Sequence, residues 1–258
     1  MKIEHARIVE HRDVAGGYRV LSLEAGDIAR AVRPGQFVHL RVPDLAAALR
    51  RPFSVYRADG DRLALLYKTV GRGTGVLARV GVGGVVDLLG PLGNGFPAPD
   101  ATCTPVLVAG GYGVAPLSLL AARTPGKGVV FIGGRTADDI LCTADFASLG
   151  WEVRIATENG SAGARGVVTD LLDTWLSGAG AGSKPEFFAC GPDGMLRAVG
   201  ARAVRRGCRA WLSLDKHMGC GVGACLACVQ RIRDAAGNVA WKRVCKDGPV
   251  FEAREIVW

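Results

Sequence analysis

The sequence predicts three consecutive parts: an all-β segment over residues 1–100, a doubly wound parallel α/β sheet over 101–214 and a small cysteine-rich segment over 215–258. Three observations support this division. Short alternating strands fill the first hundred residues, strands alternating with helices follow, and glycine and cysteine dominate from residue 219. Short strands separated by turns are typical of a barrel or sandwich. Strands that alternate with helices are typical of a parallel sheet.

The strands of the first part are recognised by residues that alternate between apolar and polar. We predict strands at Tyr18–Leu23, Phe37–Val42, Pro52–Tyr56 and Leu63–Val70. The residues 58–61 (Ala-Asp-Gly-Asp) separate the last two strands and form a favourable hairpin turn.

The second part contains five apolar runs, most of them separated by helical stretches. The predicted strands are Val106–Ala109, Val129–Ile132, Trp151–Ala156, Phe187–Cys190 and Ala210–Leu214. The predicted helices are Ala115–Arg123, Val167–Leu176 and Asp193–Arg206. In the third part, Val229–Arg233 and Val239–Val244 flank the turn residues Asp234–Asn238, which predicts a second hairpin.

Composition and charge exclude several classes of protein. Hydrophobic residues make up 49% of the 258 residues, which excludes a disordered chain. The first residues, MKIEHARIVEHRD, carry charges where a signal peptide needs an apolar core, and no apolar run reaches the roughly 18 residues of a membrane span. The net charge is +8, but the arginines are scattered and no nucleic-acid motif accompanies them. We therefore expect a cytoplasmic protein that binds neither nucleic acid nor membrane.

Four of the eight cysteines lie close together near the C-terminus. They follow the spacing Cys220-x4-Cys225-x2-Cys228, and sixteen further residues separate Cys228 from Cys245. This C-x4-C-x2-C…C pattern is the plant-type spacing for a [2Fe–2S] cluster, and soft thiolates suit iron–sulfur chemistry. A structural zinc site is the alternative, but zinc sites usually contain pairs of C-x2-C. The spacing therefore favours a [2Fe–2S] cluster.

Three short motifs in the first part indicate a flavin. They are Arg51-Pro52-Phe53-Ser54, Leu66-Tyr67-Lys68 and Gly73-Thr74. An arginine can clamp a pyrophosphate, a hydroxyl can bond a flavin ring atom, and N–H groups at a helix start can bind phosphate. Taken alone, the first motif is better explained as a strand that begins with a rigid proline. A flavin is nevertheless needed to join a one-electron cluster to a two-electron nicotinamide.

A glycine turn between the first strand and the first helix of the second part indicates a nucleotide site. The turn contains Gly110, Gly111 and Gly113, which is the right context for a pyrophosphate loop but not the strict G-x-G-x-x-G fingerprint. Cys190-Gly191-Pro192 ends the fourth strand, where ligands of such sheets bind. An ordinary strand-to-helix turn is the alternative. Arg135 could meet a 2′-phosphate, which Asp138 and Asp139 would repel.

Together these motifs resemble those of the ferredoxin–NADP reductase superfamily. The turn Gly90-Pro91-Leu92-Gly93-Asn94-Gly95-Phe96 is part of the same resemblance. The C-terminal residues are more specific. Met218–Cys228 and Val244–Phe251 resemble the electron-transfer subunits of class B dihydroorotate dehydrogenases. The resemblance covers essentially the whole chain, with Ala109 standing where relatives often have a third glycine.

The resemblance implies a ferredoxin reductase-like FAD barrel over 1–100, an NAD-binding sheet over 101–214 and a [2Fe–2S] domain over 215–258. It implies that the flavin motifs bind FAD, that the glycine turn and Cys190-Gly191-Pro192 bind NAD, and that the four clustered cysteines hold the cluster. It places Cys190 near the nicotinamide and assigns no catalytic residue.

The resemblance also implies a separate FMN-containing catalytic subunit, in a heterotetramer of two plus two, that oxidises dihydroorotate in de novo pyrimidine (UMP) synthesis. This chain would pass the electrons to NAD+. Basic residues near the cluster are expected at the rim of the contact with that partner: Lys216, Lys242, Arg243 and Lys246. Two alternatives remain: the flavin and [2Fe–2S] subunit of a ferredoxin-dependent NADP transhydrogenase or sulfide dehydrogenase, and a non-catalytic zinc-stabilised binding protein.

Overall fold

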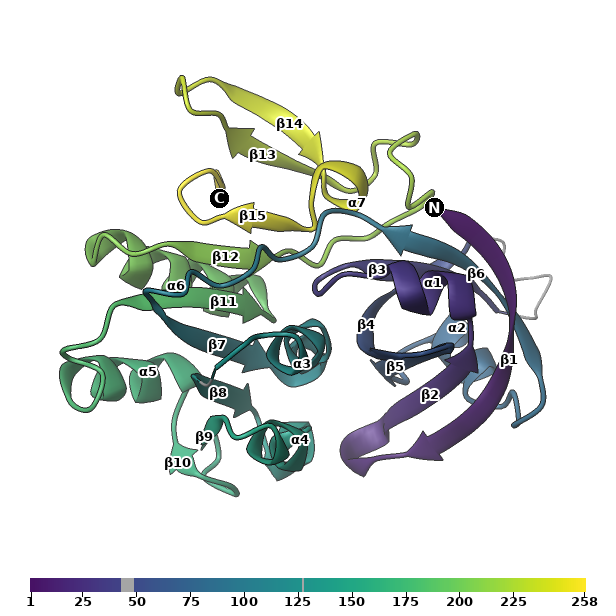
Figure 1. Cartoon of the computed structure of the whole chain (residues 1–258), viewed down its shortest axis with the longest axis horizontal. Coiled ribbons are helices and arrows are strands. Elements are labelled where there is room, and N and C mark those ends of the chain that lie inside the picture. The colour runs from purple at the N-terminus through teal and green to yellow at the C-terminus, as the bar shows by residue number, and fades with distance from the viewer. Residues whose placement is uncertain (43–48, 127) are drawn as a thin grey trace.

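The N-terminal part of the computed structural model, which describes residues 1–42, 49–126 and 128–258, is a closed six-stranded barrel (Figure 1). Its strand order is β1-β2-β5-β4-β3-β6, and all neighbours run antiparallel. The strands are β1 (Lys2–Asp13), β2 (Tyr18–Glu24), β3 (Phe37–Arg41), β4 (Arg51–Asp59), β5 (Arg62–Lys68) and β6 (Val85–Leu92). Helices α1 (Gly26–Ala31) and α2 (Arg72–Leu77) and the short 3-10 turn η1 (Ala15–Gly17) connect them. The predicted barrel and its hairpin at Gly60 are confirmed.

A seven-stranded sheet follows, in the order β10-β9-β8-β7-β11-β12-β15. Its strands are β7 (Thr104–Gly110), β8 (Val129–Gly134), β9 (Glu152–Thr157), β10 (Ala164–Arg165), β11 (Pro185–Cys190), β12 (Ala210–Ser213) and β15 (Val250–Glu252). All pairs are parallel except β12 with β15. The strand order reverses between β7 and β11, because the chain winds from β7 toward β9 and then returns to the other side. The predicted doubly wound sheet is confirmed.

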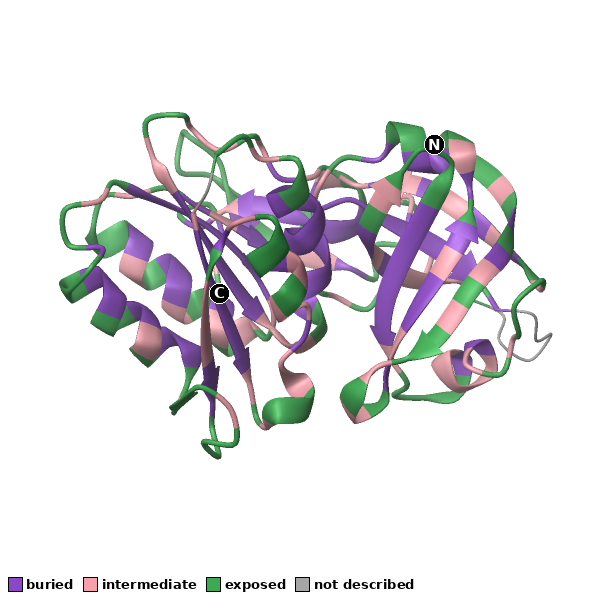
Figure 2. Ribbon diagram, turned by 60° about the horizontal axis from the view of Figure 1, so that its bottom comes forward, coloured by how far each residue is buried: buried purple, intermediate pink, exposed green. Residues whose placement is uncertain are grey.

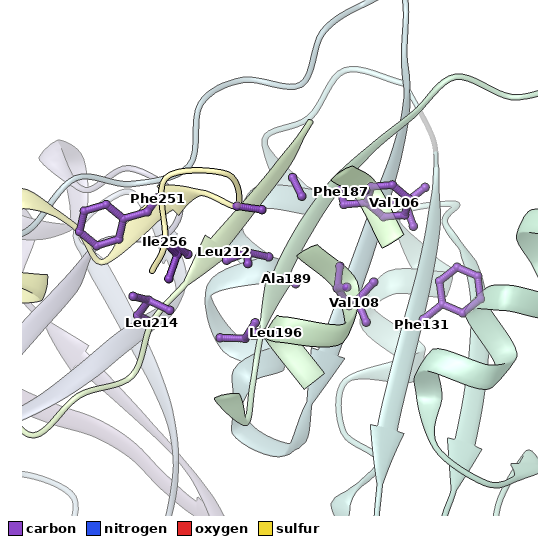
Figure 3. Packing of buried hydrophobic residues seen from close by; sticks show 14 of the residues in the cluster. Val106, Val108, Phe131, Phe187, Ala189, Leu196, Leu212, Leu214, Phe251 and Ile256 are labelled. Carbon is purple, nitrogen blue, oxygen red and sulfur yellow. The ribbon is translucent and has the colours of Figure 1, made fainter. Parts of the chain in front are cut away.

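Helices cover both faces of this sheet. They are α3 (Val114–Ala122), α4 (Thr143–Ser148), α5 (Val168–Ser177) and α6 (Asp193–Arg205), with the 3-10 turns η2 (Gly111–Gly113) and η3 (Ala137–Asp139) between strand and helix. Helices α5 and α6 pack on one face with Val106, Phe131 and Phe187, while α3 and α4 pack on the other with Leu107 and Phe188 (Figures 2 and 3). This two-sided burial explains the continuous apolar runs of the strands.

Helix α3 lies between the sheet and the barrel. Its residues are apolar on nearly all sides, and almost all of them are buried. Leu117, Leu120 and Ala121 of this helix share one core cluster with Tyr18 and Leu66 of the barrel. A helix that is apolar all round needs protein on every side. Packing against α3 therefore holds the barrel and the sheet in one arrangement.

The C-terminal segment consists of the hairpin β13 (Val229–Arg233) and β14 (Val239–Arg243), the short helix α7 (Val244–Asp247) and strand β15. Figure 1 shows the hairpin projecting beside the barrel and the sheet. Phe251 and Ile256 pack against Leu212 and Leu214, so this segment extends the core of the sheet (Figure 3). The domain boundaries at residues 100 and 214 stay a prediction.

Several elements were not predicted from the sequence, among them β1, β6 and β15. Strand β1 was not predicted because its exposed face carries a run of charged residues, and β6 and β15 were not predicted because they are defined by long-range pairing. Among the helices in the described ranges, none has both the length and the apolar character needed to cross a membrane.

Candidate electron-transfer sites

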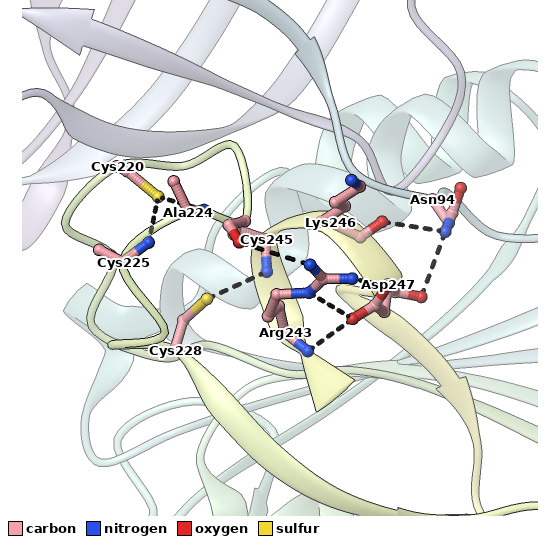
Figure 4. A network of polar contacts seen from close by, with 10 residues as sticks. Asn94, Cys220, Ala224, Cys225, Cys228, Arg243, Cys245, Lys246 and Asp247 are labelled. Carbon is pink, nitrogen blue, oxygen red and sulfur yellow. Dashed lines mark hydrogen bonds and ion pairs between the residues drawn. The ribbon is translucent and has the colours of Figure 1, made fainter. Parts of the chain in front are cut away.

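The four clustered cysteines come from one loop and one short helix. Cys220, Cys225 and Cys228 lie in the loop between β12 and β13, and Cys245 lies in α7. Positive φ angles at Gly221 and Gly223 allow this loop to turn tightly. Cys228 and Cys245 are buried, whereas Cys225 is exposed. The structure therefore brings the predicted ligands to one place with one side facing solvent (Figure 4).

Backbone N–H groups point at the sulfurs. The N–H groups of Ala224 and Cys225 lie 3.2 and 3.4 Å from Cys220 Sγ, and the N–H of Cys245 lies 3.3 Å from Cys228 Sγ (Figure 4). Although partial burial raises the pKa of the Cys220 thiol, these donors outweigh it and lower that pKa to about 6. Burial and the neighbouring Cys228 thiol raise the pKa of Cys245 to about 12. Donors of this kind favour an anionic sulfur, as a cluster ligand requires.

The loop also fits a cluster in its packing. A Cβ at Gly219 would lie 3.2 Å from Cys225 Sγ, so glycine leaves room beside the thiol. Within the described ranges, no three His, Cys, Asp or Glu side chains are arranged to hold a single metal ion. The fit to a [2Fe–2S] cluster rests instead on four thiols, their spacing and the N–H donors around them.

Polar contacts fix the helix that carries Cys245. Arg243 pairs with Asp247 (Nε to Oδ2, 3.0 Å), and Arg243 Nη1 donates to the carbonyl of Gly223 at 3.4 Å. Asn94 Nδ2 donates to the carbonyls of Lys246 and Asp247, each at 3.2 Å (Figure 4). Asn94 follows β6, so these bonds tie the cysteine loop to the end of the barrel.

A cavity of about 200 Å³ lies between the barrel and the sheet. Most of the predicted flavin residues line it: Pro52, Phe53, Ser54, Leu66, Tyr67, Lys68 and Thr74. Further residues of the barrel and of the two later parts complete the lining: Phe37, Val70, Tyr112, Gly113, Cys190, Ser213, Leu214, Asp215, Met218 and Pro249. An apolar cleft with a few polar groups fits the ring of a flavin.

The two predicted flavin residues outside this lining lie against each other. A Cβ at Gly73 would be 2.9 Å from Arg51 Nε, so glycine lets the guanidinium pack closely at this position. Arg51 Nη1 donates to the carbonyl of Leu49. The Thr74 hydroxyl accepts the N–H groups of Val70 and Gly71 at 3.0 and 3.1 Å, which caps helix α2. We propose that Arg51 holds the flavin phosphates and that Thr74 mainly shapes the turn.

A second cavity, of about 790 Å³, opens along the carboxyl ends of the strands at the point where their order reverses. It is lined by every predicted nucleotide residue: Gly110, Gly111, Gly113, Cys190, Gly191 and Pro192. The two turns approach closely, because a Cβ at Gly113 would lie 2.2 Å from the carbonyl oxygen of Cys190. Open α/β sheets bind their ligands at this switch point, so the cavity fits a dinucleotide.

The two cavities meet at Lys68, Tyr112, Cys190 and Asp215, which line both. The Tyr112 hydroxyl lies 3.2 Å from Asp215 Oδ2. Burial, with the charge of Asp215 nearby, raises the pKa of Cys190 to about 12, so its thiol stays neutral. Loss of hydration also raises the pKa of the Asp215 carboxyl, although it remains open to solvent through the cavity. This junction of the two cavities is where a bound nicotinamide would meet a bound flavin.

Comparisons with known proteins agree with this geometry. The family model described as the iron–sulfur cluster binding domain of dihydroorotate dehydrogenase B matches residues 215–257. The chain is 38% identical over 265 residues to the "Dihydroorotate dehydrogenase B (NAD(+)), electron transfer subunit" of Bacillus mycoides strain KBAB4, and equally to that of Bacillus cereus strain Q1. Each match covers 100% of this chain and 99% of the relative. The chain belongs to the family of dihydroorotate dehydrogenase B electron transfer subunits.

Solved structures show the same fold. A chain of the NADH-dependent reduced ferredoxin–NADP oxidoreductase, studied for flavin-based electron bifurcation, superposes with a TM-score of 0.85 at 27% identity over 99% of this chain and 90% of that one. The flavohem-like FAD/NAD binding domain of nitric oxide dioxygenase from Vibrio cholerae superposes with a TM-score of 0.67 at 19% identity. The match covers 80% of this chain and 95% of that one. The first of these corresponds to the transhydrogenase alternative. The higher full-length identity to the dihydroorotate dehydrogenase B subunits favours that family.

Several residues at these family sites were not predicted from the sequence, among them Phe37, His39 and Asp215. Phe37 and Asp215 line the flavin cavity, and His39 packs against the cysteine loop. Burial and the nearby Arg50 and Arg51 lower the pKa of His39 to about 4. The only local signal was a histidine within an otherwise buried strand, which a core position would also explain.

The basic residues expected at the partner rim divide into two pairs. Lys216 bonds Asp193 at 2.9 Å and Arg243 bonds Asp247, so both are engaged within this chain. Lys242 and Lys246 are exposed beside the cysteine loop. We retain a rim contact as a proposal for Lys242 and Lys246.

Arg51→Ala is expected to weaken FAD binding by about tenfold or more. A charge-assisted hydrogen bond contributes roughly 1.5–3 kcal/mol, and 1.4 kcal/mol is about one decade in Kd. FAD titration of the apoprotein measures the change. Arg62→Ala, an exposed arginine at the start of β5, should bind FAD normally. Equal FAD affinity in the two variants would contradict the role of Arg51.

Proposed function

We propose that this chain is the electron-transfer subunit of an NAD-dependent dihydroorotate dehydrogenase of de novo pyrimidine (UMP) synthesis. It would link the FMN of a separate catalytic subunit to NAD+ in a heterotetramer of two plus two. When bound, a [2Fe–2S] cluster supplies one-electron transfer, FAD converts between one and two electrons, and nicotinamide carries hydride. The observation that supports the proposal most strongly is that the cysteine loop, the flavin cavity and the nucleotide cavity adjoin one another in one chain.

Particular residues provide this continuity. Met218 lines the flavin cavity and lies two residues before Cys220. At the other end of the cavity, Tyr112, Cys190 and Asp215 form the boundary with the nucleotide cavity. The apolar side chains of Phe37 and Pro249 line the cavity and would keep water from the ring of a bound flavin, which protects its reduced forms. The chain thus orders three binding sites in a row.

The surface near the cysteines supports contact with a partner. Cys225 and Leu226 are exposed at the outer edge of the loop, Leu226 at 60%, and Trp241 on β14 is 66% exposed. A one-electron carrier must come close to the next redox centre, so its exposed edge is the natural side for the catalytic subunit. Exposed aromatic residues are typical anchors of protein interfaces.

The nucleotide cavity supports NAD rather than NADP. Asp139 and Glu158 line it together with Arg135, and the Arg135 N–H donates to Asp139 Oδ2 at 3.2 Å. Two carboxylates would repel a 2′-phosphate. Asp138 has a different role, because it packs against Gly16 of η1. A cytoplasmic location is part of the proposal, since no disulfide joins any of the eight cysteines, all of which lie in the described residues.

The test is purification with and without a co-expressed catalytic subunit. We expect dihydroorotate-dependent NAD+ reduction only in the presence of the partner. The chain alone should oxidise NADH with an artificial acceptor, because hydride entry needs only the flavin and nucleotide sites. The control is the same preparation after removal of FAD, which should lose both reactions. Dihydroorotate oxidation by the isolated chain, or no restoration by any FMN-bearing partner, would overturn the assignment.

A further inference from the structure

His39 is a fully buried polar side chain without a partner. Its exposed fraction is 0%, and neither ring nitrogen has a hydrogen-bond partner among the described residues. A neutral imidazole carries one donor and one acceptor, and leaving a buried polar group unpaired costs about 1–3 kcal/mol. The arrangement therefore indicates a ligand that supplies the missing partner.

The ring faces the cysteine loop. A Cβ at Gly221 would lie 2.5 Å from His39 Nδ1, so the imidazole packs directly on the residue that follows Cys220. Neighbouring protein groups do not satisfy the ring. Asp87, a partly buried carboxylate on the adjoining strand β6, is bound through Oδ2 to Arg50 at 2.6 Å, and Arg50 Nη1 donates to the backbone carbonyl of His39.

Strand β3 presents two rings on its outer face. Val38 and Leu40 belong to the barrel core, whereas Phe37 lines the flavin cavity and His39 meets the cysteine loop. Successive side chains of a strand point to opposite faces, which explains the division. The ring centroids of Phe37 and His39 are 6.1 Å apart. One strand thus contacts both the flavin cavity and the cluster site.

We propose that His39 donates a ring N–H to a sulfur of the [2Fe–2S] cluster and thereby raises the reduction potential of that cluster. The proposal rests on the cluster of the proposed function. Sulfurs of a cluster carry negative charge, and hydrogen bonds to them are a principal means by which a protein sets the potential. Because the reduced cluster carries one more negative charge, the hydrogen bond stabilises it more than the oxidised form.

The experiment compares two variants of the holoprotein. His39→Leu removes both ring nitrogens at similar volume, and His39→Gln keeps an N–H donor. The midpoint potential is measured by redox titration followed by the electron paramagnetic resonance signal of the reduced cluster. In His39→Leu the ratio of reduced to oxidised cluster at a fixed potential should fall roughly two- to tenfold, as loss of one hydrogen bond implies. His39→Gln should recover most of the wild-type ratio, and His5→Leu on the exposed surface of β1 should not change it.

A second measurement does not depend on how the variants fold. Wild-type holoprotein labelled with ¹⁵N-histidine and reduced should show a nitrogen coupling to the cluster in pulsed electron paramagnetic resonance. That coupling should disappear in His39→Gln. Absence of the coupling in wild-type protein, or an equal potential shift in the Leu and Gln variants, overturns the proposal. A wild-type protein without iron and sulfide would instead refute the cluster itself, and the proposed function with it.

Discussion

We expect that replacing any one of Cys220, Cys225, Cys228 and Cys245 by alanine abolishes cluster binding. Wild-type protein should contain about two iron atoms and two acid-labile sulfides per chain, and each variant close to none. The loss is large because each cysteine is one of four thiolate ligands. The buried positions of Cys228 and Cys245 also leave no room for a replacement ligand from solvent. Iron and sulfide analysis, with the visible spectrum, measures the result.

Cys103→Ala and Cys208→Ala are the matched controls. Both cysteines are partly buried and lie outside the C-terminal loop, so their removal should leave iron and sulfide unchanged. Stoichiometric zinc without sulfide in the wild-type protein would contradict the prediction and restore the zinc alternative. Loss of the cluster from a control variant would show that stability, not ligation, is measured.

Gly113→Ala is expected to weaken nucleotide binding by about fivefold to a hundredfold. Gly113 has φ −59°, which alanine adopts easily, so backbone strain is not the cause. The cause is steric: the new Cβ would lie 2.2 Å from the carbonyl oxygen of Cys190 and would push the two nucleotide turns apart. Overpacking of this kind costs roughly 1–3 kcal/mol. The KM for NADH in the artificial-acceptor assay measures the effect.

Gly182→Ala is the control, because a Cβ at that loop position meets nothing within 4 Å. Its KM for NADH should equal that of wild type. In Gly113→Ala, iron and sulfide contents should remain normal, since the clash lies at the nucleotide turns and away from the cysteine loop. An unchanged KM in this variant would show that the turns do not bind the nucleotide.

Local patterns were enough to predict most of the fold. The hairpin turns at Gly60 and Asp234–Asn238 and the helices α3, α5 and α6 are each determined by residues close in sequence. The parallel sheet followed from strands alternating with helices, because that connection brings consecutive strands side by side. Strand β1 carries eight charged residues or histidines along its length, so its buried apolar residues Ala6 and Ile8 were too few to reveal it.

The sites show the same division between local and long-range information. Each motif was predicted because its residues are neighbours in sequence, as with Cys220, Cys225 and Cys228. The junction of the two cavities was not predictable, because Tyr112 and Asp215 meet only after the sheet forms. His39 was missed for a related reason: an isolated histidine in a strand has no meaning until Gly221 is placed against it.

Strand β15 also limits aggregation through the edge of the sheet. The sheet ends at β10, with two residues, and at β15, with three, and β15 pairs antiparallel with β12. Very short edge strands give another chain little backbone to pair with, which discourages association of sheets edge to edge. The segment that carries the cluster ligands thus also covers the long parallel strands, so that redox capacity and protection from aggregation depend on the same stretch of chain.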